Sequence, residues 1–275
     1  MKIKLIALDL DGTTLDNNRR ITTRTKNALE EAARQGVNIV VATGRPYTAL
    51  PEDIFNIEAI RYVLTSNGAA ITDLKTNEII YRNCLSPLAA VKSVELLRKY
   101  DYIIETFTHG NAYMQADYWY EIKRTGKSFR SVEYLLSTRE PMEDIYQYIL
   151  DNRDIIENIN VNFEDTSKKQ EMMEILKTIP ETTITSSFDC NLEIGGETTS
   201  KADALMKLEG ILNVSKEEMM AFGDSLNDKA MLELAGFAVA MGNGVGEIKE
   251  IADYVTLPNT EDGVAHAVEK FVIGA

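Results

Sequence analysis

Residues 7–16 read ALDLDGTTLD, with two carboxylates, Asp9 and Asp11, directly after an apolar run. The run from Ile3 to Leu8 has the composition of a buried strand. A buried carboxylate is costly unless a cation or a hydrogen-bond donor compensates it. Because side chains alternate along an extended segment, Asp9 and Asp11 can face the same side. The stretch therefore predicts a strand ending in a charged site, with an ordinary turn at Asp11-Gly12 as the alternative.

Strand-like and helical segments alternate around this stretch and again near the other end of the chain. We predict strands at 2–8, 37–42, 62–65, 219–222, 237–241 and 254–257, and helices at 22–35 and 201–212. Continuous apolar strands of this kind fit a parallel sheet covered by helices on both faces. The terminal parts of the chain therefore predict an α/β core with a Rossmann-like parallel sheet.

The middle of the chain has a different pattern. It predicts helices at 86–100 and 167–177, a hairpin of 103–108 with 112–116, and strands at 155–163 and 182–188. Such a mixture is typical of an α+β unit with antiparallel pairing. We therefore predict a core domain built from residues 1–83 and 191–275, with an α+β domain inserted at 84–190.

Composition and charge limit the classes of function. The chain has 275 residues, of which 44% are hydrophobic and 26% charged, and its formal net charge is −14. Nucleic acids and anionic membranes require a basic face, so neither is expected as the main partner. No apolar run approaches the roughly 18 residues of a membrane span. The apolar stretch within the first residues, MKIKLIALD, is too short for a secretory signal. We therefore expect a cytoplasmic location, and no protein partner is evident.

The two cysteines, Cys84 and Cys190, exclude a disulfide scaffold, and no close Cys/His grouping suggests zinc. They lie where the chain is predicted to enter and to leave the insertion. Since an inserted domain is entered and left through neighbouring linkers, we expect these two thiols to lie close together.

Three further polar groups follow predicted strands of the core: Thr43-Gly44-Arg45, Asn67-Gly68 and the segment from Asp224 to Asp228. In an open parallel sheet, ligands bind beyond the carboxyl ends of the strands. All these groups should therefore converge with Asp9 and Asp11 at one edge of the sheet. Their common placement is stronger evidence for a site than any one motif.

Each of these groups also has a purely structural interpretation. Thr43 would cap a helix that begins near Pro46. Asn67 is a common turn residue. Ser225 and Asp228 have the spacing of a capping box, so Asp228 serves a structural purpose in that interpretation.

Lys201 follows Thr199-Ser200 and falls in the first turn of a predicted helix. A cation is disfavoured there by up to about 1 kcal/mol, because the helix dipole is positive at that end. A nearby anion would explain the lysine, and a solvated surface charge is the alternative. The glycine-rich segment 242–246 does not fit a dinucleotide fingerprint, because its third glycine comes one position too early for GxGxxG.

Taken together, DLDGTTLD (9–16), ATGRP (42–46), Lys201 and GDSLND (223–228) resemble the haloacid dehalogenase superfamily. SNGA (66–69) and AMGNG (240–244) resemble its Cof-type phosphatases, which carry a type IIB cap. The sequence departs from the family at Ala202, where glycine is common, and at Ser225, where asparagine is frequent. Neither departure removes a reactive group.

The resemblance implies a Mg²⁺-dependent phosphatase that hydrolyses small phosphorylated metabolites such as sugar phosphates through an aspartyl-phosphate. Asp9 would be the nucleophile and Asp11 the general acid and then base, with Thr43 and Lys201 completing the catalytic set. The phosphate-binding residues would be Asp9, Leu10, Asp11, Gly12, Thr43, Gly44, Arg45, Lys201 and Asn227. The residues implied at the metal are Asp9, Asp11 through its backbone carbonyl, Asp224 and Asp228.

Two other functions remain open at this point. A phosphomutase of the same superfamily would carry a similar cap. A phospho-accepting receiver module also uses Asp, Thr, Lys and Mg²⁺, but such a module is near half this length and has no inserted domain. Since the core motifs recognise only phosphate and metal, we expect the insertion to select the substrate. Within it, His109, Trp119 and Lys127 are predicted to contribute to a sugar-facing surface.

Overall fold

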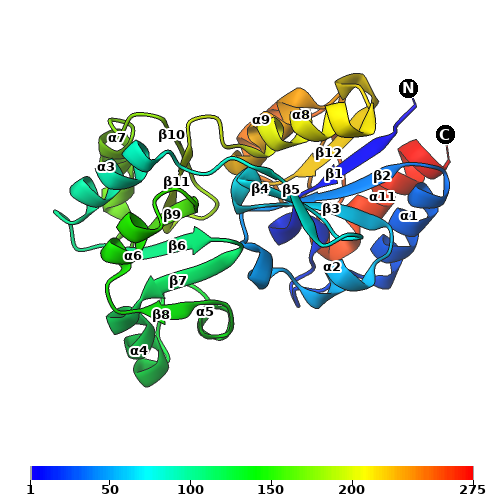
Figure 1. Ribbon diagram of the computed structural model, residues 1–275. Coiled ribbons are helices and arrows are strands. Elements are labelled where there is room, and N and C mark those ends of the chain that lie inside the picture. The colour runs from blue at the N-terminus through cyan, green and yellow to red at the C-terminus, as the bar shows by residue number, and fades with distance from the viewer. Residues whose placement is uncertain (1, 275) are drawn as a thin grey trace. The chain divides into compact units, whose positions relative to one another are not determined.

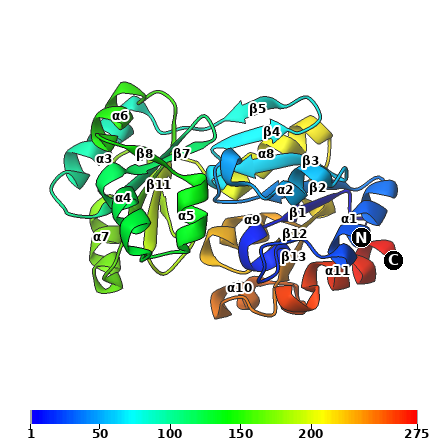
Figure 2. The same cartoon turned by 90° about the horizontal axis from the view of Figure 1, so that it is seen from below.

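The computed structural model describes residues 2–274, which form two compact units (Figures 1 and 2). The first unit contains the described residues up to Gly44, then Leu50–Tyr81, then those from Ser200 onward. The second contains Arg45–Ala49 and Arg82–Thr199. An insertion is therefore present, and the second unit extends past residue 190 to Thr199.

The first unit is built on an eight-stranded sheet in the order β14-β13-β12-β1-β2-β3-β4-β5. The strands are β1 (Leu5–Leu8), β2 (Asn38–Ala42), β3 (Ile60–Thr65), β4 (Ala70–Asp73), β5 (Glu78–Arg82), β12 (Met219–Gly223), β13 (Phe237–Ala240) and β14 (Tyr254–Val255). The pairs from β14 to β3 are all parallel, as the apolar runs predict. β4 is antiparallel to β3, and the β4–β5 hairpin was not among the predicted strands.

Helices cover both faces of this sheet, with α1 and α11 on one face and α8 and α9 on the other (Figure 1). They are α1 (Thr23–Arg34), α2 (Glu52–Asn56), α8 (Lys201–Leu212), α9 (Lys229–Leu234), α10 (Gly246–Ile251) and α11 (Gly263–Val268). Thr22 caps α1 by accepting a hydrogen bond from the Thr25 amide, and α8 has the predicted bounds. No helix within residues 2–274 has the length and the apolar composition that a bilayer-spanning segment requires.

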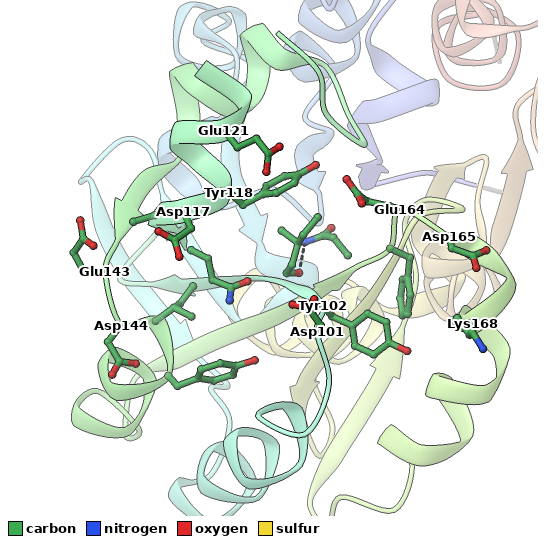
Figure 3. A pocket seen from close by; sticks show the side chains of 17 residues that line it. Asp101, Tyr102, Asp117, Tyr118, Glu121, Glu143, Asp144, Glu164, Asp165 and Lys168 are labelled. Carbon is green, nitrogen blue, oxygen red and sulfur yellow. Dashed lines mark hydrogen bonds between the residues drawn. The ribbon is translucent and has the colours of Figure 1, made fainter. Parts of the chain in front are cut away.

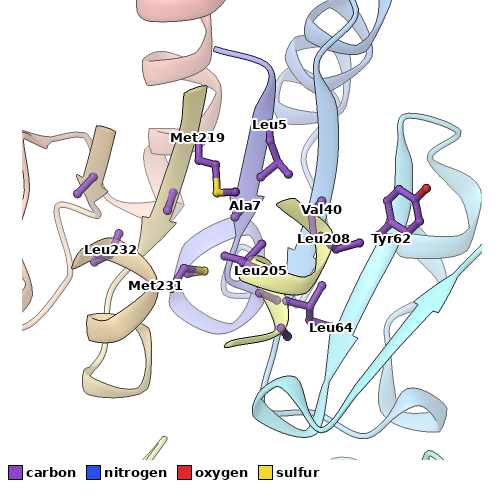
Figure 4. Close-up of a cluster of buried hydrophobic side chains, with 14 of the residues drawn as sticks. Leu5, Ala7, Val40, Tyr62, Leu64, Leu205, Leu208, Met219, Met231 and Leu232 are labelled. Atoms are coloured by element: carbon purple, nitrogen blue, oxygen red, sulfur yellow. The ribbon is translucent and has the colours of Figure 1, made fainter. Parts of the chain in front are cut away.

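One apolar layer of the first unit lies between the sheet and α8 (Figure 4). Leu5 and Ala7 of β1 point toward Leu205 and Leu208 of α8, and Met219 of β12 joins them. These side chains are almost fully buried, which contributes roughly 1.5–3 kcal/mol for each large aliphatic group. This layer fixes the first turn of α8, and hence Lys201, against the sheet.

The second unit contains a six-stranded mixed sheet in the order β10-β11-β9-β6-β7-β8. The strands are β6 (Ile103–Thr108), β7 (Asn111–Gln115), β8 (Glu140–Met142), β9 (Ile156–Asn162), β10 (Thr182–Thr185) and β11 (Asn191–Gly196). The helices are α3 (Pro87–Leu97), α4 (Ala116–Thr125), α5 (Val132–Thr138), α6 (Ile145–Asp151) and α7 (Lys169–Leu176). The predicted hairpin is present as β6 and β7, and among the pairs described within this second sheet only β7–β8 is parallel.

α3, α6 and α7 pack on one face of this second sheet. Ile104 of β6 and Val161 of β9 lie in this layer with Leu97 of α3 and Ile149 of α6. β11 belongs to this sheet because it pairs antiparallel with β9. The pairing explains why the second unit does not end at residue 190 as predicted.

Candidate active site

The carboxyl ends of three neighbouring parallel strands bring the predicted motifs together in the first unit. β1 lies between β12 and β2 in the sheet. Asp9 follows β1, Thr43 follows β2, and Asp224 follows β12. Parallel strands end at the same edge, so residues distant in sequence become neighbours.

Lys201 lies at the centre of this group and is almost fully buried, with an exposed fraction of 1%. Its Nζ lies 2.5 Å from Oδ1 of Asp9 and 2.6 Å from Oδ1 of Asp228. Burial disfavours the charged form, but the two carboxylates outweigh it and raise the pKa of Lys201 above its usual value. Lys201 is therefore a permanent ammonium group that faces anions in spite of its place in the first turn of α8.

Asp9, Asp224 and Asp228 each place one carboxylate oxygen within 4.8 Å of the others. Burial, followed by the charge of Asp228, raises the pKa of Asp9 well above its usual value. The same two causes raise the pKa of Asp224 to about 6. Three carboxylates against one lysine leave an excess of buried negative charge, which a divalent cation would balance. Within residues 2–274 this is the one such cluster of potential metal ligands.

The Asp11 side chain is not part of this carboxylate cluster, although its charge contributes to the raised pKa of Asp224. Asp11 is partly exposed and adopts extended backbone angles. Its charge therefore reaches Asp224, while its side chain keeps contact with solvent. A residue that exchanges protons with a substrate or with water requires such access.

Asp228 has both of the roles that its sequence motif allowed, a helix cap and a member of the site. Its Oδ2 accepts hydrogen bonds from the amides of Asp224, at 3.0 Å, and Ser225, at 3.1 Å, which forms the predicted capping box. Its Oδ1 bonds to Lys201. Asp228 therefore holds the loop after β12 in shape and also fixes the lysine.

Gly12 lets the loop after β1 pass close to Asp224. Its φ is +82°, and a Cβ at this position would lie 2.5 Å from Oδ2 of Asp224. The neighbouring Thr13 donates its hydroxyl to Oδ1 of Asp224 at 2.8 Å. Asn243 donates to the carbonyl of Gly12 at 2.7 Å. Sequence reasoning missed Thr13 and Asn243 as supports of the site, although Asn243 lies in the AMGNG motif.

Thr43, Asn67 and Asn227 form a second line of contacts at the same edge. The Asn67 amide donates to the Thr43 carbonyl at 3.0 Å, and Nδ2 of Asn227 donates to Oδ1 of Asn67 at 3.3 Å. Asn67 has a φ of +57°, so it is a turn residue as well as a contact. Gly68 is required beside it, because a Cβ there would lie 2.2 Å from the Ser200 carbonyl.

The other residues predicted to bind phosphate lie on either side of these groups. Leu10 is fully buried after β1, so only its backbone is suited to a ligand. Gly44 ends the first segment of the first unit, and Arg45 begins the second unit. There Arg45 donates to the Ala49 carbonyl at 3.0 Å and lies 5.1 Å from the centre of the Tyr134 ring.

The predicted sugar-facing residues of the second unit have different environments. His109 occupies the exposed β6–β7 turn with a φ of +48°. Trp119 is half-buried in α4, and its indole donates to the Arg139 carbonyl at 3.0 Å, so its ring takes part in packing. Lys127 is exposed beyond α4. Their part in specificity stays a prediction.

The second unit also contains an open cavity of about 600 Å³ whose rim carries many carboxylates (Figure 3). The acidic residues around it are Asp101, Asp117, Glu121, Glu143, Asp144, Glu164 and Asp165. Lys168 is the one basic residue that lines it. Such a surface repels phosphate groups, so this cavity is not a candidate for binding them.

Comparison with known proteins agrees with the geometry of the first unit. The family model of haloacid dehalogenase-like hydrolases matches residues 6–268. The 5-amino-6-(5-phospho-D-ribitylamino)uracil phosphatase YcsE of Bacillus subtilis is 31% identical over 271 residues, covering 98% of this chain and 96% of YcsE. A crystal structure of a haloacid dehalogenase-like hydrolase from B. subtilis, 32% identical, superposes with a TM-score of 0.84, covering 98% of this chain and 100% of that one.

The fold also matches a structure of the subclass IIB sugar phosphatase BT4131, with a TM-score of 0.81 at 24% identity and 98% coverage of each chain. At this identity the likeness establishes the fold, including the mixed sheet of the second unit as the cap. The family match extends over nearly the whole chain, and the site residues lie on one edge of the expected sheet. The chain belongs to the haloacid dehalogenase-like hydrolases and is a Cof-type phosphatase with a type IIB cap, acting on small phosphorylated metabolites.

Proposed function

We propose that this phosphatase hydrolyses sugar- or polyol-phosphate monoesters in a Mg²⁺-dependent reaction that passes through an aspartyl-phosphate on Asp9. The observation that carries the proposal is the contact of Asp9 with Lys201 inside a cluster of three carboxylates. Oδ1 of Asp9 accepts the hydrogen bond from Lys201, which leaves Oδ2 as the oxygen not held by the lysine. That oxygen is the one suited to attack phosphorus.

The carboxylate cluster fits a magnesium ion by its chemistry. Mg²⁺ prefers oxygen ligands and is commonly held by one or two carboxylates together with substrate phosphate. Asp9 and Asp224 would hold it, with Asp228 nearby. The ion would neutralise phosphate charge and, by its own charge, favour the ionised form of Asp9, whose pKa is otherwise raised by burial and by the charge of Asp228.

In the first step, an Asp9 oxygen forms a bond to phosphorus while the bond from phosphorus to the ester oxygen breaks. Asp11 donates its proton to the departing oxygen, which leaves as an alcohol. Lys201 and Thr43 stabilise the charge of the phosphoryl oxygens during transfer. The products of the step are the free alcohol, the phosphorylated Asp9 and an ionised Asp11.

In the second step, Asp11 accepts a proton from water while the water oxygen attacks phosphorus. The bond between phosphorus and Asp9 breaks, and inorganic phosphate leaves. Asp11 ends protonated and Asp9 ionised, so both groups return to their starting state. This double use suits a carboxyl group that is only partly buried and lies near other negative charges.

The substrate class is supported by YcsE, whose name describes a phosphatase for a ribityl phosphate carrying a uracil ring. Phosphate esters of sugars and polyols share the phosphomonoester and a hydroxyl-bearing chain with that compound. A net charge of −14 gives anionic substrates no general attraction, so the local cation and metal must provide it.

The test is single-turnover kinetics with Asp9→Asn and Asp11→Asn, alongside Asp154→Asn as an exposed aspartate outside the site. Asp9→Asn should lose turnover at least about 1,000-fold while keeping its circular dichroism spectrum, because the nucleophile is absent. Asp11→Asn should slow both steps, and the first step should recover with good leaving groups that need no proton. Asp154→Asn should match the parent protein.

Near-normal kcat for Asp9→Asn would overturn the covalent mechanism. A panel of phosphorylated metabolites, assayed for released phosphate and for rearranged product, tests the substrate class. Isomerised sugar phosphate formed in the presence of a bisphosphorylated activator would instead support a phosphomutase.

A further inference from the structure

β5 is the outermost strand of the first unit's sheet. It follows β4 in the strand order and has no neighbour on its other side among the strands described. All five of its residues, Glu78 to Arg82, are exposed or only half-buried. An edge of this kind presents unpaired backbone amides and carbonyls that another strand can bind.

The sequence of β5, EIIYR, contains no proline, glycine or lysine, and its charged residues, Glu78 and Arg82, stand only at its two ends. Ile79 and Ile80 are 39% and 36% exposed, so two adjacent large apolar side chains of this strand meet solvent. The edge is therefore both capable of pairing and apolar.

We propose that β5 pairs antiparallel with β5 of a second copy of this chain, about a two-fold axis at Ile80, to form a reversible dimer. In this register Glu78 lies opposite Arg82 of the other copy, and Ile79 lies opposite Tyr81. Ile80 meets Ile80 on the axis. The two sheets would join into one continuous sheet across the dimer.

The charges of the strand favour this arrangement over others. Glu78 and Arg82 lie at opposite ends of β5 on the same face, because residues four apart in a strand point the same way. Antiparallel pairing about Ile80 places each carboxylate opposite a guanidinium at both ends. Parallel pairing would place Glu78 beside Glu78 and Arg82 beside Arg82, which is unfavourable. The strand is therefore complementary to itself, and this favours a second copy as the occupant.

The side chains of β5 point to the two faces of the sheet, so the contacts that they make within the chain leave the outer backbone edge of the strand accessible. Tyr81 turns toward α8, where its hydroxyl donates to Asp203 at 2.6 Å, and Ile79 shares that face. Glu78, Ile80 and Arg82 occupy the opposite face. Arg82 has one described ion-pair neighbour, Glu157, at the long distance of 4.0 Å. A five-residue contact is small, so association should depend on concentration in the range of weak interfaces.

Sedimentation equilibrium over a range of protein concentrations tests the proposal, with a reductant present to keep both thiols free. The variants are E78R, R82E and an equal mixture of the two, and K75E in the hairpin turn is the matched charge control. The average mass of the parent protein and of K75E should rise from one chain toward two with concentration.

E78R alone and R82E alone should each remain single chains, because like charges then meet at both ends of the paired strands. Their mixture should regain at least the parent's association, because one strand carries two arginines and the other two glutamates. E78R lowers the net negative charge and R82E raises it, so a general charge effect would move the two variants in opposite directions.

The proposal is overturned if the parent stays a single chain at every concentration, if either single reversal associates like the parent, or if the mixture fails to associate. Phosphatase activity of each variant shows that it is folded, since none of these residues belongs to the proposed active site. The outcome is independent of the proposed substrate and mechanism.

Discussion

Replacing Lys201 with methionine should destabilise the first unit strongly, because it removes the cation that two buried carboxylates share. Asp9 and Asp228 both bond to Nζ and both are at least nine-tenths buried. Removing one partner of a buried ion pair typically costs about 3–5 kcal/mol. Protonation limits the loss: placing a proton at pH 7 on a carboxyl group of pKa about 3.9 costs about 4 kcal/mol. We therefore expect the free energy of unfolding to fall by about 3–5 kcal/mol at pH 7.

The pH dependence of this loss has a definite sign. Protonating a stranded carboxyl becomes easier by about 1.4 kcal/mol for each unit that the pH falls. The difference between Lys201→Met and the parent should therefore shrink as the pH is lowered from 7 toward 5. Added Mg²⁺ should also reduce the difference, since it would supply positive charge to the same carboxylates.

Urea unfolding followed by far-UV circular dichroism in the presence of a chelator measures the effect. Trp119, the single tryptophan, lies in the second unit, so its fluorescence reports on that unit separately. Lys207→Met is the control, because Lys207 is an exposed lysine on the same helix. A loss below about 1 kcal/mol at pH 7, the range of surface ion pairs, would refute the reasoning. A loss that does not change with pH would refute it as well.

Three further results are expected. Gly12→Ala should lower kcat at least about 100-fold in steady-state assays with the fold retained, because a Cβ 2.5 Å from the Asp224 carboxylate displaces a member of the carboxylate cluster. The hydrogen bond from the Arg61 guanidinium lowers the pKa of Asp73. The pair therefore stabilises the folded protein at pH values above the pKa that this carboxyl has in the unfolded chain. The stabilisation is lost as the pH falls through the lower pKa of the folded protein. Asp73→Asn should therefore lower the thermal midpoint at pH 7 and change it little at pH 3. Burial raises the pKa of Cys84 to about 11. Its alkylation at pH 8, followed by peptide mass spectrometry, should be roughly 200-fold slower than that of an ordinary thiol because of the smaller thiolate fraction.

The parallel sheet and its polar edge could be predicted because their signals are local. Each apolar strand ends at a polar residue within the same short stretch, as at Leu8-Asp9 and Ala42-Thr43. The rule that ligands lie beyond parallel strand ends then brings the stretches together. Lys201 could be singled out because a cation in the first turn of a helix needs an explanation.

Pairing between distant strands could not be read from the chain. The segment of β11 has no feature that assigns it to one sheet or the other, and its hydrogen bonds to β9 decide the matter. The hairpin partner β5 was missed because an exposed edge strand has no buried face and so no alternating pattern.

The prediction that the two cysteines lie close together was wrong for a similar reason. The residue after Cys84 bonds to Ile156 at one end of β9, whereas Cys190 bonds to Phe163 beyond its other end. A seven-residue strand spans about 20 Å, so the two thiols are held far apart. Cys190 does not lie in the exit linker, because β11 follows it and runs back along β9 toward the end near Cys84. The chain leaves the second unit at Thr199, whose hydroxyl donates to the Asn83 carbonyl at 2.8 Å, so the two linkers are neighbours although the two thiols are not.

The central place of β1 in the sheet has a consequence for the growing polypeptide on the ribosome. Leu5 is paired with Met219, so one neighbour of β1 is synthesised more than 200 residues after it. At about 5–20 residues per second, the apolar LIAL strand waits roughly 10–40 s with an unprotected edge. Asp9 is likewise made near the start of synthesis, whereas Lys201 and the other two carboxylates of the cluster are made near its end. A chain released before residue 219 would therefore expose an unpaired apolar strand, which favours aggregation. It would also lack two of the three clustered carboxylates, so we expect it to have no activity.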